Sequence, residues 1–484
     1  MKSTVVRSGI LSVLLILSVT GFSQKDPWLS FKLPEPLNPP YSSAVGDSVV
    51  LFVDANNSRL IWAFNLKESC WREYHAPSGI AHTASIMAGR GVAMISNDSI
   101  IIGFSSQKDT LAYLFYEGLP MTGGQYRGAQ NDLCWFYTKE KIYVFDGTDG
   151  RWHSFPAPAG AFNVLVTAKE KYLAFFTSTT PANFRVLTIY NQLTKNFHQI
   201  QFADEYRYIE YLDDGLVFVR RKPGSDDYYG SFTVKNDYIE QKAIPCVLEI
   251  ANRVSDSDYT DFHYEPRYSV LLTGRTLPSS DFKIYYYIIG FDTRLGYFTR
   301  DSVINDISTY EYNVFVGPAY SQNSYAVAAK NYMYKGERYA SDLIIYNGLT
   351  GSFSTHSVNL TGGKLGIIIH PTINAVLASG IQQWPSNVPT SWQGINPFQG
   401  GLTETMMFDL QKHMAYGSSH FYCRDFIMHS YQVGDTLRLL WYNSVFNKIH
   451  KYIGIKPNTS SYSLRSGIDY CVISDINRDT RKKM

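Results

Sequence analysis

The stretch IYVFDGTDGRWHSFPAP, residues 142–158, contains the pattern that decides the fold. An apolar run ends in the aromatic residue Phe145, and Asp146 follows it before a short segment rich in Gly. A second aromatic residue, Trp152, begins another alternating stretch seven positions after the first. Asp side chains hydrogen-bond their own turn backbone and Gly supplies positive φ, so the segment predicts a β-hairpin closed by a tight turn.

The same pattern recurs along the chain. Four further segments have an aromatic residue, then Asn or Asp, then a second aromatic residue at the same offset of seven: Phe64, Asn65 and Trp71; Tyr190, Asn191 and Phe197; Phe291, Asp292 and Phe298; Tyr346, Asn347 and Phe353. Degenerate copies are at Phe104 and Leu111, Phe232 and Ile239, Phe408–Asp409 and Ala415, and Tyr442–Asn443 and Ile449. These nine copies lie 34 to 62 residues apart, and the last two intervals, 62 and 34, are the extremes.

Each copy is preceded by one or two further apolar runs, such as DLCWFYT at 132–138, so one unit comprises about four short strands. No amphipathic helical period of useful length separates the units, which indicates an all-β protein. Four-stranded units at this period predict a single β-propeller, in which the sheets pack radially around a central channel. We expect about eight four-stranded blades, with seven or nine allowed because the short interval could hold two hairpins of one blade.

The segment IYVFDGTDGRW, Ile142 to Trp152, resembles the last two strands of the blades in kelch repeats and in the central domain of galactose oxidase. The resemblance covers most of the mature chain and implies the propeller fold. A kelch blade usually carries a Gly-Gly pair before its Tyr and Trp. The pairs Gly123–Gly124, Gly362–Gly363 and Gly400–Gly401 lie elsewhere in these repeats.

The two ends of the chain suggest how the propeller closes. PWLSFKLPEP, residues 27–36, parallels RWHSFPAP and so predicts a lone fourth strand. YSLRSGIDYCVISD, residues 462–475, reads as inner strands without outer partners. Pairing them in one blade would close the circle and remove exposed sheet edges, giving a single domain over residues 24–484.

The N-terminus predicts export. Lys2 and Arg7 precede the apolar run from Ile10 to Val19, and small residues precede a cleavage site after Ser23. Ten apolar residues are too few to span a bilayer, so residues 1–23 are interpreted as a signal peptide. We expect a periplasmic or extracellular protein of a bacterium, monomeric and without a membrane-spanning segment after cleavage.

The composition describes a globular protein, with 45% hydrophobic and 18% charged residues. A net charge of +2 provides no broad attraction to nucleic acid. Five widely spaced Cys have no zinc-ligand spacing and predict buried thiols rather than a disulfide framework. The acidic segment 255–267 lacks the EF-hand spacing, so neither a metal nor another cofactor is expected.

The widest departure from the repeat is IQQWPSNVPTSWQGINPFQGG, residues 381–401. Its Trp384, Trp392 and Phe398 lie among Pro, Gly, Gln and Asn, a mixture suited to stacking on a sugar ring or to anchoring a protein partner. The alternative is a long loop that folds over a blade and covers apolar surface. These three residues are the predicted ligand-binding residues.

No catalytic motif is evident. A glycosidase needs two carboxylates set across a sugar, and no local motif pairs them here. Read alone, Asp146 and Asp149 look like catalytic acids, but the equivalent Asn residues of other copies identify Asp146 as a turn residue. The sequence therefore favours an exported, non-enzymatic propeller that binds a protein or glycan through exposed loops at the mouth of its channel. The alternative is a carbohydrate-active enzyme, a glycoside hydrolase or lyase with carboxylates at the central channel.

Overall fold

The computed structural model describes residues 42–475 apart from gaps at 55–56, 67, 82–83, 122–124, 180–184, 203–205, 222–226, 252–265, 277–282, 307–311, 336, 359–364, 383–387, 408–418, 434–435, 456–461 and 467–470. Within these residues the secondary structure consists of 38 β-strands and no helix, which confirms the all-β prediction. The chain forms two compact units, Met1–Asp204 (unit 1) and Glu205–Met484 (unit 2), which are described separately below.

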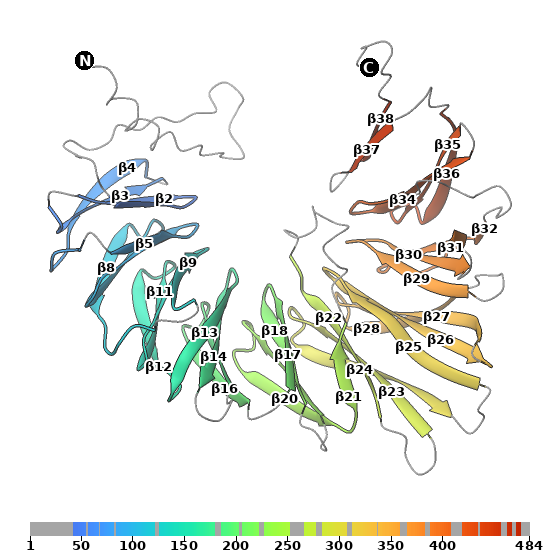
Figure 1. The fold of residues 1–484 in the computed structure, drawn as a ribbon, viewed down its shortest axis with the longest axis horizontal. Helices are drawn as coiled ribbons and strands as arrows, with labels where there is room; N and C mark the ends of the chain where they lie inside the picture. The colour runs from blue at the N-terminus through green and yellow to red at the C-terminus, as the bar shows by residue number, and fades with distance from the viewer. Residues whose placement is uncertain are drawn as a thin grey trace. The chain divides into compact units, whose positions relative to one another are not determined.

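Unit 1 contains four four-stranded antiparallel sheets, each built from strands that are consecutive in sequence (Figure 1). They are blade 1, with β1 (Ser42–Val45), β2 (Val49–Val53), β3 (Leu60–Asn65) and β4 (Cys70–His75); blade 2, with β5 (Ser85–Ala88), β6 (Val92–Ser96), β7 (Ile100–Ser105) and β8 (Thr110–Phe115); blade 3, with β9 (Arg127–Gln130), β10 (Leu133–Tyr137), β11 (Lys141–Asp146) and β12 (Arg151–Pro156); and blade 4, with β13 (Ala161–Ala168), β14 (Tyr172–Thr179), β15 (Arg185–Asn191) and β16 (Phe197–Phe202).

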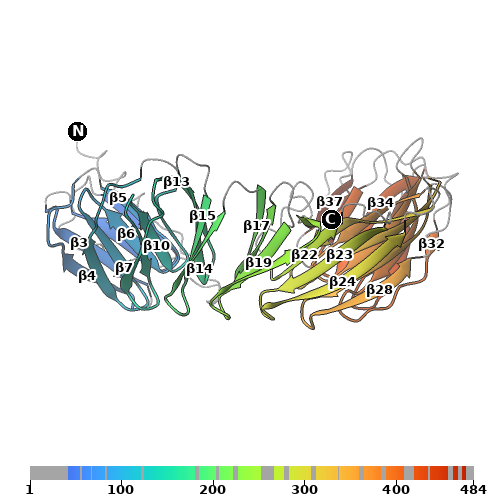
Figure 2. The ribbon, with the colours of Figure 1, turned by 90° about the horizontal axis from the view of Figure 1, so that it is seen from below.

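Strands of unit 2 such as β23 (Lys283–Asp292) and β24 (Tyr297–Asp306) lie side by side in Figure 2. Among the described residues, unit 2 repeats the arrangement of unit 1 in five four-stranded sheets and adds a two-stranded sheet. They are blade 5, with β17 (Tyr206–Leu212), β18 (Gly215–Arg221), β19 (Asp227–Thr233) and β20 (Ile239–Ile244); blade 6, with β21 (Val247–Ile250), β22 (Ser269–Arg275), β23 (Lys283–Asp292) and β24 (Tyr297–Asp306); blade 7, with β25 (Tyr312–Ser321), β26 (Tyr325–Tyr334), β27 (Glu337–Asn347) and β28 (Ser352–Val358); blade 8, with β29 (Leu365–Pro371), β30 (Val376–Gln382), β31 (Val388–Ile395) and β32 (Met406–Met407); blade 9, with β33 (Ser419–Tyr422), β34 (Phe426–Val433), β35 (Thr436–Asn443) and β36 (Lys448–Ile455); and the pair β37 (Tyr462–Ser466) and β38 (Cys471–Asp475).

The core of each unit lies between successive blades. In unit 1, for example, Leu51 and Ile61 of blade 1 share a buried cluster with Ile100 and Ile102 of blade 2. Comparable clusters join blades 2 and 3, blades 3 and 4, and each successive pair from blade 5 to blade 9. Consecutive four-stranded sheets that bury their faces against one another are the blades of a β-propeller architecture.

The repeated aromatic pairs have the predicted geometry. In each of the five complete copies the two aromatic residues lie directly opposite one another on the third and fourth strands of a blade. Their ring centroids are 4.6 to 5.3 Å apart. The degenerate copies that begin at Phe104, Phe232 and Tyr442 keep the same cross-strand pairing. The repeat is therefore a cross-strand pair that covers the interface with the neighbouring blade.

In blade 8 the structure corrects the predicted position of one copy of the repeat. Phe408 and Asp409, the predicted start of this copy, lie outside the described residues. Their place on the third strand is taken by Ile395, which forms a bridge to Leu402, and by Asn396. With Ile395 as the reference the last two intervals become 49 and 47 residues. Segment 381–401 is therefore no single long loop, because β30 runs to Gln382 and β31 begins at Val388.

The number of blades and the closure of the ring remain predictions. The described residues form nine four-stranded sheets, so the expected count of eight is not confirmed, although nine lies within the predicted range. Strands β37 and β38 pair with each other. The segments 1–23 and 27–36, on which the signal-peptide and closure predictions depend, lie outside the described residues.

The cysteines fit the prediction of isolated thiols where the structure describes them. Among the described cysteines, Cys70, Cys134, Cys246 and Cys423 carry thiols outside any disulfide, and the last three are buried. Burial raises the pKa of the Cys134 thiol well above its usual range. The Cys134 thiol therefore belongs to the core and is a poor nucleophile.

Candidate functional site in the outer turns

The turn between the third and fourth strands of each blade, here called the outer turn, contains the polar residues singled out in the sequence. The Asp146 Oδ1 atom accepts a hydrogen bond from the backbone N–H of Thr148 at 2.8 Å. The equivalent Asn191 and Asn347 accept from backbone N–H groups two residues on, at 3.0 and 2.9 Å. The interpretation of Asp146 as a turn residue is therefore confirmed.

The outer turns share one backbone feature at a position that the sequence pattern above does not specify. The fifth residue after the first aromatic residue, or after Ile395 in blade 8, has positive φ in all nine described four-stranded sheets. These residues are Ser69, Asp109, Gly150, Lys195, Asp237, Gly296, Gly351, Gly400 and Asn447. Five of the nine are not glycine, although the left-handed region costs other residues roughly 1–2 kcal/mol. Interactions of the turn must offset that cost at those five positions.

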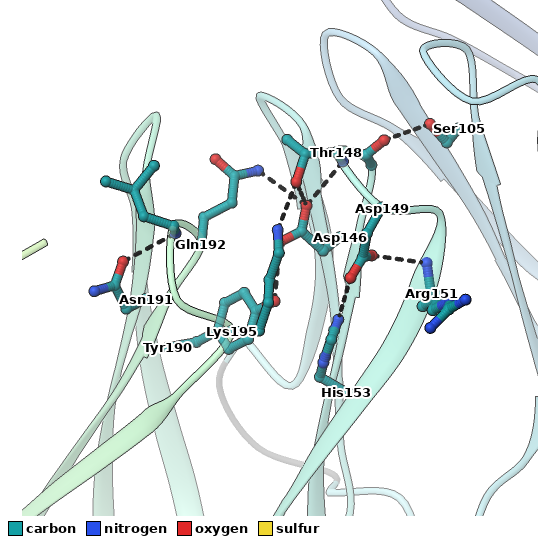
Figure 3. Close-up of polar contacts among 12 residues, drawn as sticks. Ser105, Asp146, Thr148, Asp149, Arg151, His153, Tyr190, Asn191, Gln192 and Lys195 are labelled. Atoms are coloured by element: carbon teal, nitrogen blue, oxygen red, sulfur yellow. Dashed lines mark hydrogen bonds and ion pairs between the residues drawn. The ribbon is translucent and has the colours of Figure 1, made fainter. Parts of the chain in front are cut away.

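At the joint between blades 3 and 4, the offsetting interaction is an ion pair (Figure 3). The carboxylate of Asp146 is fully buried, and Lys195 Nζ of blade 4 donates to its Oδ2 atom at 2.6 Å. Tyr190 OH donates to the same oxygen at 2.9 Å, and Gln192 Nε2 donates to Oδ1 at 3.3 Å. Three side chains of blade 4 therefore bind one carboxylate of blade 3.

The protonation state of Tyr190 follows from this contact. Burial, and then the adjacent Asp146 carboxylate, raise the pKa of the Tyr190 hydroxyl far above its usual range. The hydroxyl is therefore a permanent donor. Lys195 Nζ also donates to Thr148 Oγ1 at 2.6 Å, so the ammonium group joins both sides of the outer turn to blade 4. The Asp146 carboxylate is saturated with protein donors and shielded from solvent, an arrangement that holds two blades together and admits no substrate.

Asp149, the second acidic residue of the opening segment, has its own partners. Its carboxylate accepts a hydrogen bond from the backbone N–H of Arg151 at 3.0 Å and lies 2.9 Å from His153 Nε2. The His153 ring packs against Tyr190, with centroids 5.6 Å apart. Both carboxylates that resemble a catalytic pair in the sequence thus stabilise the outer turn and its contact with blade 4.

Comparable contacts join other pairs of outer turns. Arg72 Nε of blade 1 donates to Asp109 Oδ2 of blade 2 at 2.7 Å. In unit 2, Asn236 Nδ2 donates to the carbonyl of Gly296 at 2.8 Å, and Asn447 Nδ2 donates to the carbonyl of Gly401 at 3.1 Å. The residue with positive φ, or its neighbour, makes each contact. Alignment of the repeats on the first aromatic position would have identified these residues.

The predicted ligand-binding residues are not brought together on an exposed surface of the described chain. Trp384 lies outside the described residues. Trp392 lies on β31 and is fully buried in the core between blades 8 and 9, 5.3 Å from the ring of His429. Phe398 is half-buried and meets the ring of Tyr325 edge-on at 5.8 Å. The expected exposed position of Trp392 is therefore corrected, because β31 is a core strand. Ligand binding by the three residues stays a prediction.

A buried Ser–His–Tyr chain also lies between blades 8 and 9. His370 Nε2 is 3.0 Å from Ser379 Oγ, and His370 Nδ1 is 2.8 Å from Tyr422 OH. Such a chain resembles the hydrogen-bonded arrangement that activates a serine nucleophile, but the Ser379 side chain is buried. The chain of hydrogen bonds instead joins blade 8 to blade 9.

The remaining candidate from the sequence is the acidic segment considered as a metal site. The acidic segment 255–267 falls largely in the gap at 252–265. Among the described residues, no group of three or more His, Cys, Asp or Glu side chains is placed to hold a metal ion. The same part of the chain contains no helix long and apolar enough to cross a membrane.

Comparisons with known proteins do not assign the chain to a family. No family model and no curated protein matches it. Solved structures similar to it include a eukaryotic initiation factor (10% identity, 79% of this chain and 91% of that chain, TM-score 0.28). Others are the WD40 domain of SCAP from fission yeast (11%, 70% and 94%, 0.22) and the β-propeller domain of the Trilobed protease from Pyrococcus furiosus (8%, 76% and 97%, 0.28). At these TM-scores the similarities carry no argument, and the propeller architecture rests on the sheets themselves.

Proposed function

We propose that the chain is an exported binding protein with kelch-like blades that recognises a protein partner. The observation that carries this proposal is an exposed apolar group in unit 1, here called the blade 2 surface: Tyr113, Phe115 and Leu119. All three side chains are more than half exposed, and the rings of Tyr113 and Phe115 meet edge-on at 6.2 Å. Exposed aromatic residues are enriched at the centres of protein interfaces.

The composition of β8 distinguishes this surface from its neighbours. The fourth strands of the neighbouring blades 1 and 3 carry charges, Arg72 and Glu73 on β4 and Arg151 on β12, whereas β8 has the sequence TLAYLF. Charged residues on outer strands prevent unwanted pairing with other proteins. A neutral, aromatic outer strand favours contact instead.

The backbone beneath the blade 2 surface is held in place. Tyr143 OH accepts a hydrogen bond from the backbone N–H of Glu117 at 2.8 Å. The carbonyl of Leu119 accepts one from the N–H of Lys139 at 2.9 Å. Gly118 between them has a φ of 84°, and a Cβ at this position would collide with Glu140. A surface already ordered in the free protein loses little conformational entropy on binding.

Two further classes of function remain predictions. A glycan ligand would depend on Trp384, Trp392 and Phe398, of which Trp392 is buried. A carbohydrate-active enzyme would need two accessible carboxylates, and the candidate pair Asp146 and Asp149 is engaged in the joint between blades 3 and 4. The exposed aromatic residues of blade 2 favour a protein partner over both.

The test uses the mature chain, starting at Gln24, with the double substitution Tyr113→Ser and Phe115→Ser. A matched control is Tyr238→Ser, because Tyr238 and Tyr113 are both 52% exposed. We expect cross-linked partners from the extracytoplasmic fraction to be lost in the double variant and kept in the control, with the Tm of both variants unchanged. Retention of the same partners by the double variant would contradict the proposal. So would selective binding on a glycan array, or turnover of a glycoside.

A further inference from the structure

The outer turns of blades 7, 8 and 9 differ in composition from the other six. In each of the other outer turns, the five residues after the first aromatic position include at least one charged residue. The corresponding segments NGLTG (347–351), NPFQG (396–400) and NSVFN (443–447), here called the neutral turns, contain none. They instead present exposed apolar side chains at Leu349, Val445 and Phe446, and Phe446 is 72% exposed.

The neutral turns are neighbours on one surface of unit 2. Asn447 Nδ2 of blade 9 donates to the carbonyl of Gly401, next to the neutral turn of blade 8, at 3.1 Å. A Cβ on Gly400 would lie 3.6 Å from His356 of β28, which follows the neutral turn of blade 7. The exposed apolar residues therefore form one row, contributed by the neutral turns of blades 7 and 9 on either side of the neutral turn of blade 8.

Positive charge follows this apolar row. Strand β36 begins directly after the neutral turn of blade 9 and presents exposed Lys448 and Lys451, with exposed Tyr452 next to them. Strands β28, β32 and β36 contain no acidic residue, and Glu404 is the acidic residue between Ile395 and Met407. Lys448 directly follows the turn, and at about 3.3 Å per strand residue Lys451 lies about 10 Å further along β36.

We propose that the neutral turns dock onto an anionic lipid bilayer. Val445, Phe446 and Leu349 enter the boundary between headgroups and acyl chains, and Lys448 and Lys451 contact the anionic headgroups. Interfacial membrane binding combines these features: buried apolar area, Lys or Arg near the anionic surface, and an aromatic residue with a polar tip at the interface. Apolar side chains that project from separate turns need no matched pocket in a bilayer, whereas a protein partner would have to supply one for each.

This proposal goes beyond the proposed function and does not depend on it, because the blade 2 surface belongs to unit 1. The full mature chain is sedimented with vesicles of phosphatidylcholine, with and without phosphatidylglycerol. We expect binding to the anionic vesicles, weaker but still measurable at high salt because only the charged contribution is screened. The double variant Val445→Ser and Phe446→Ser should weaken binding by about tenfold or more. Lys448→Gln with Lys451→Gln should remove the preference for phosphatidylglycerol.

Two control variants test whether vesicle binding is specific to the neutral turns. Tyr238→Ser, on the charged outer turn of blade 5, should leave vesicle binding unchanged, as should the blade 2 double variant. In a Phe446→Trp variant, the fluorescence of the added tryptophan should be quenched by brominated acyl chains, which reports insertion of the turn directly. Absence of vesicle binding, or equal binding by the Val445 and Phe446 double variant, would overturn the proposal. If that variant instead loses a protein partner while vesicles fail to bind, the neutral turns are a protein-binding surface.

Discussion

The joint between blades 3 and 4 provides a quantitative test of how the repeat is stabilised. Lys195→Met removes the ammonium group and keeps a flexible side chain of similar length at the same positive-φ position. It leaves the Asp146 carboxylate, which has no exposed surface, without its counter-charge. Tyr190 and Gln192 still donate to the carboxylate, but both are neutral.

The expected magnitude follows from burial. Removing one partner of a buried ion pair costs about 3–5 kcal/mol, because the remaining charge is uncompensated. Asp146→Asn should cost less, since Lys195 is 28% exposed and its ammonium can turn to water. The double variant should recover part of the loss, with a coupling energy above about 1 kcal/mol. At roughly 2–4 °C per kcal/mol for a unit of this size, Lys195→Met should lower the Tm of unit 1 by about 10 °C.

The matched control is Arg72→Met. Arg72, on β4 of blade 1, also pairs with an Asp of the neighbouring blade, at 2.7 Å, but its side chain is 49% exposed. An exposed pair adds little to stability, so this variant should be nearly neutral. Denaturant unfolding gives the free energies, and amide hydrogen exchange in β11 and β15 locates the effect. If Lys195→Met costs no more than Arg72→Met, or no more than Asp146→Asn, the carboxylate does not depend on the lysine and the reasoning is wrong.

Two further predictions concern packing and pH. Gly394 lies under the ring of Tyr442, where a Cβ would overlap the ring, so Gly394→Ala should cost about 1–3 kcal/mol. A Cβ on Gly400 would make an ordinary contact, 3.6 Å from His356, so Gly400→Ala carries only the strain of its positive φ and denaturant unfolding should rank it as the milder change. Burial raises the pKa of Tyr137 to about 12 from the usual 10.0, so the unfolded chain binds fewer protons between these pH values. Stability should therefore fall as the pH rises from 10 to 12, and this part of the fall should be smaller in Tyr137→Phe when both proteins are unfolded in denaturant at each pH; an equal fall in the two proteins would contradict this.

The repeated hairpin could be predicted from the sequence because its physical requirements fall on few residues. Two rings that lie opposite one another on adjacent strands must be separated by a fixed number of residues once the turn length is fixed. The Asp or Asn that closes the turn must directly follow the first ring. Phe145, Asp146 and Trp152 meet both requirements, and so do the other complete copies.

The copy in blade 8 escaped prediction because its requirement is less specific. The first position needs apolar volume at the interface with a neighbouring blade, and Ile395 supplies it without a ring. Because the pattern requires an aromatic residue, the sequence predicts this copy at Phe408 and a loop where β31 lies. Trp392 then resembled an exposed binding residue, whereas its ring fills the core between blades 8 and 9.

Whether Asn or Asp closes an outer turn depends on the partners available to its side chain, which only a comparison of several copies shows. In blade 8, the Asn396 amide accepts from its own turn and donates to the carbonyl of Ser444 in blade 9, so it needs no charge. A carboxylate at this position has no donor to offer, and once buried it requires a cation. Asp146 obtains one from Lys195 of blade 4, and Asp292, equally buried, obtains one from Arg294 of its own turn at 2.6 Å. Lys195 and Arg294 are therefore explained by the Asp that closes the preceding outer turn or the same one.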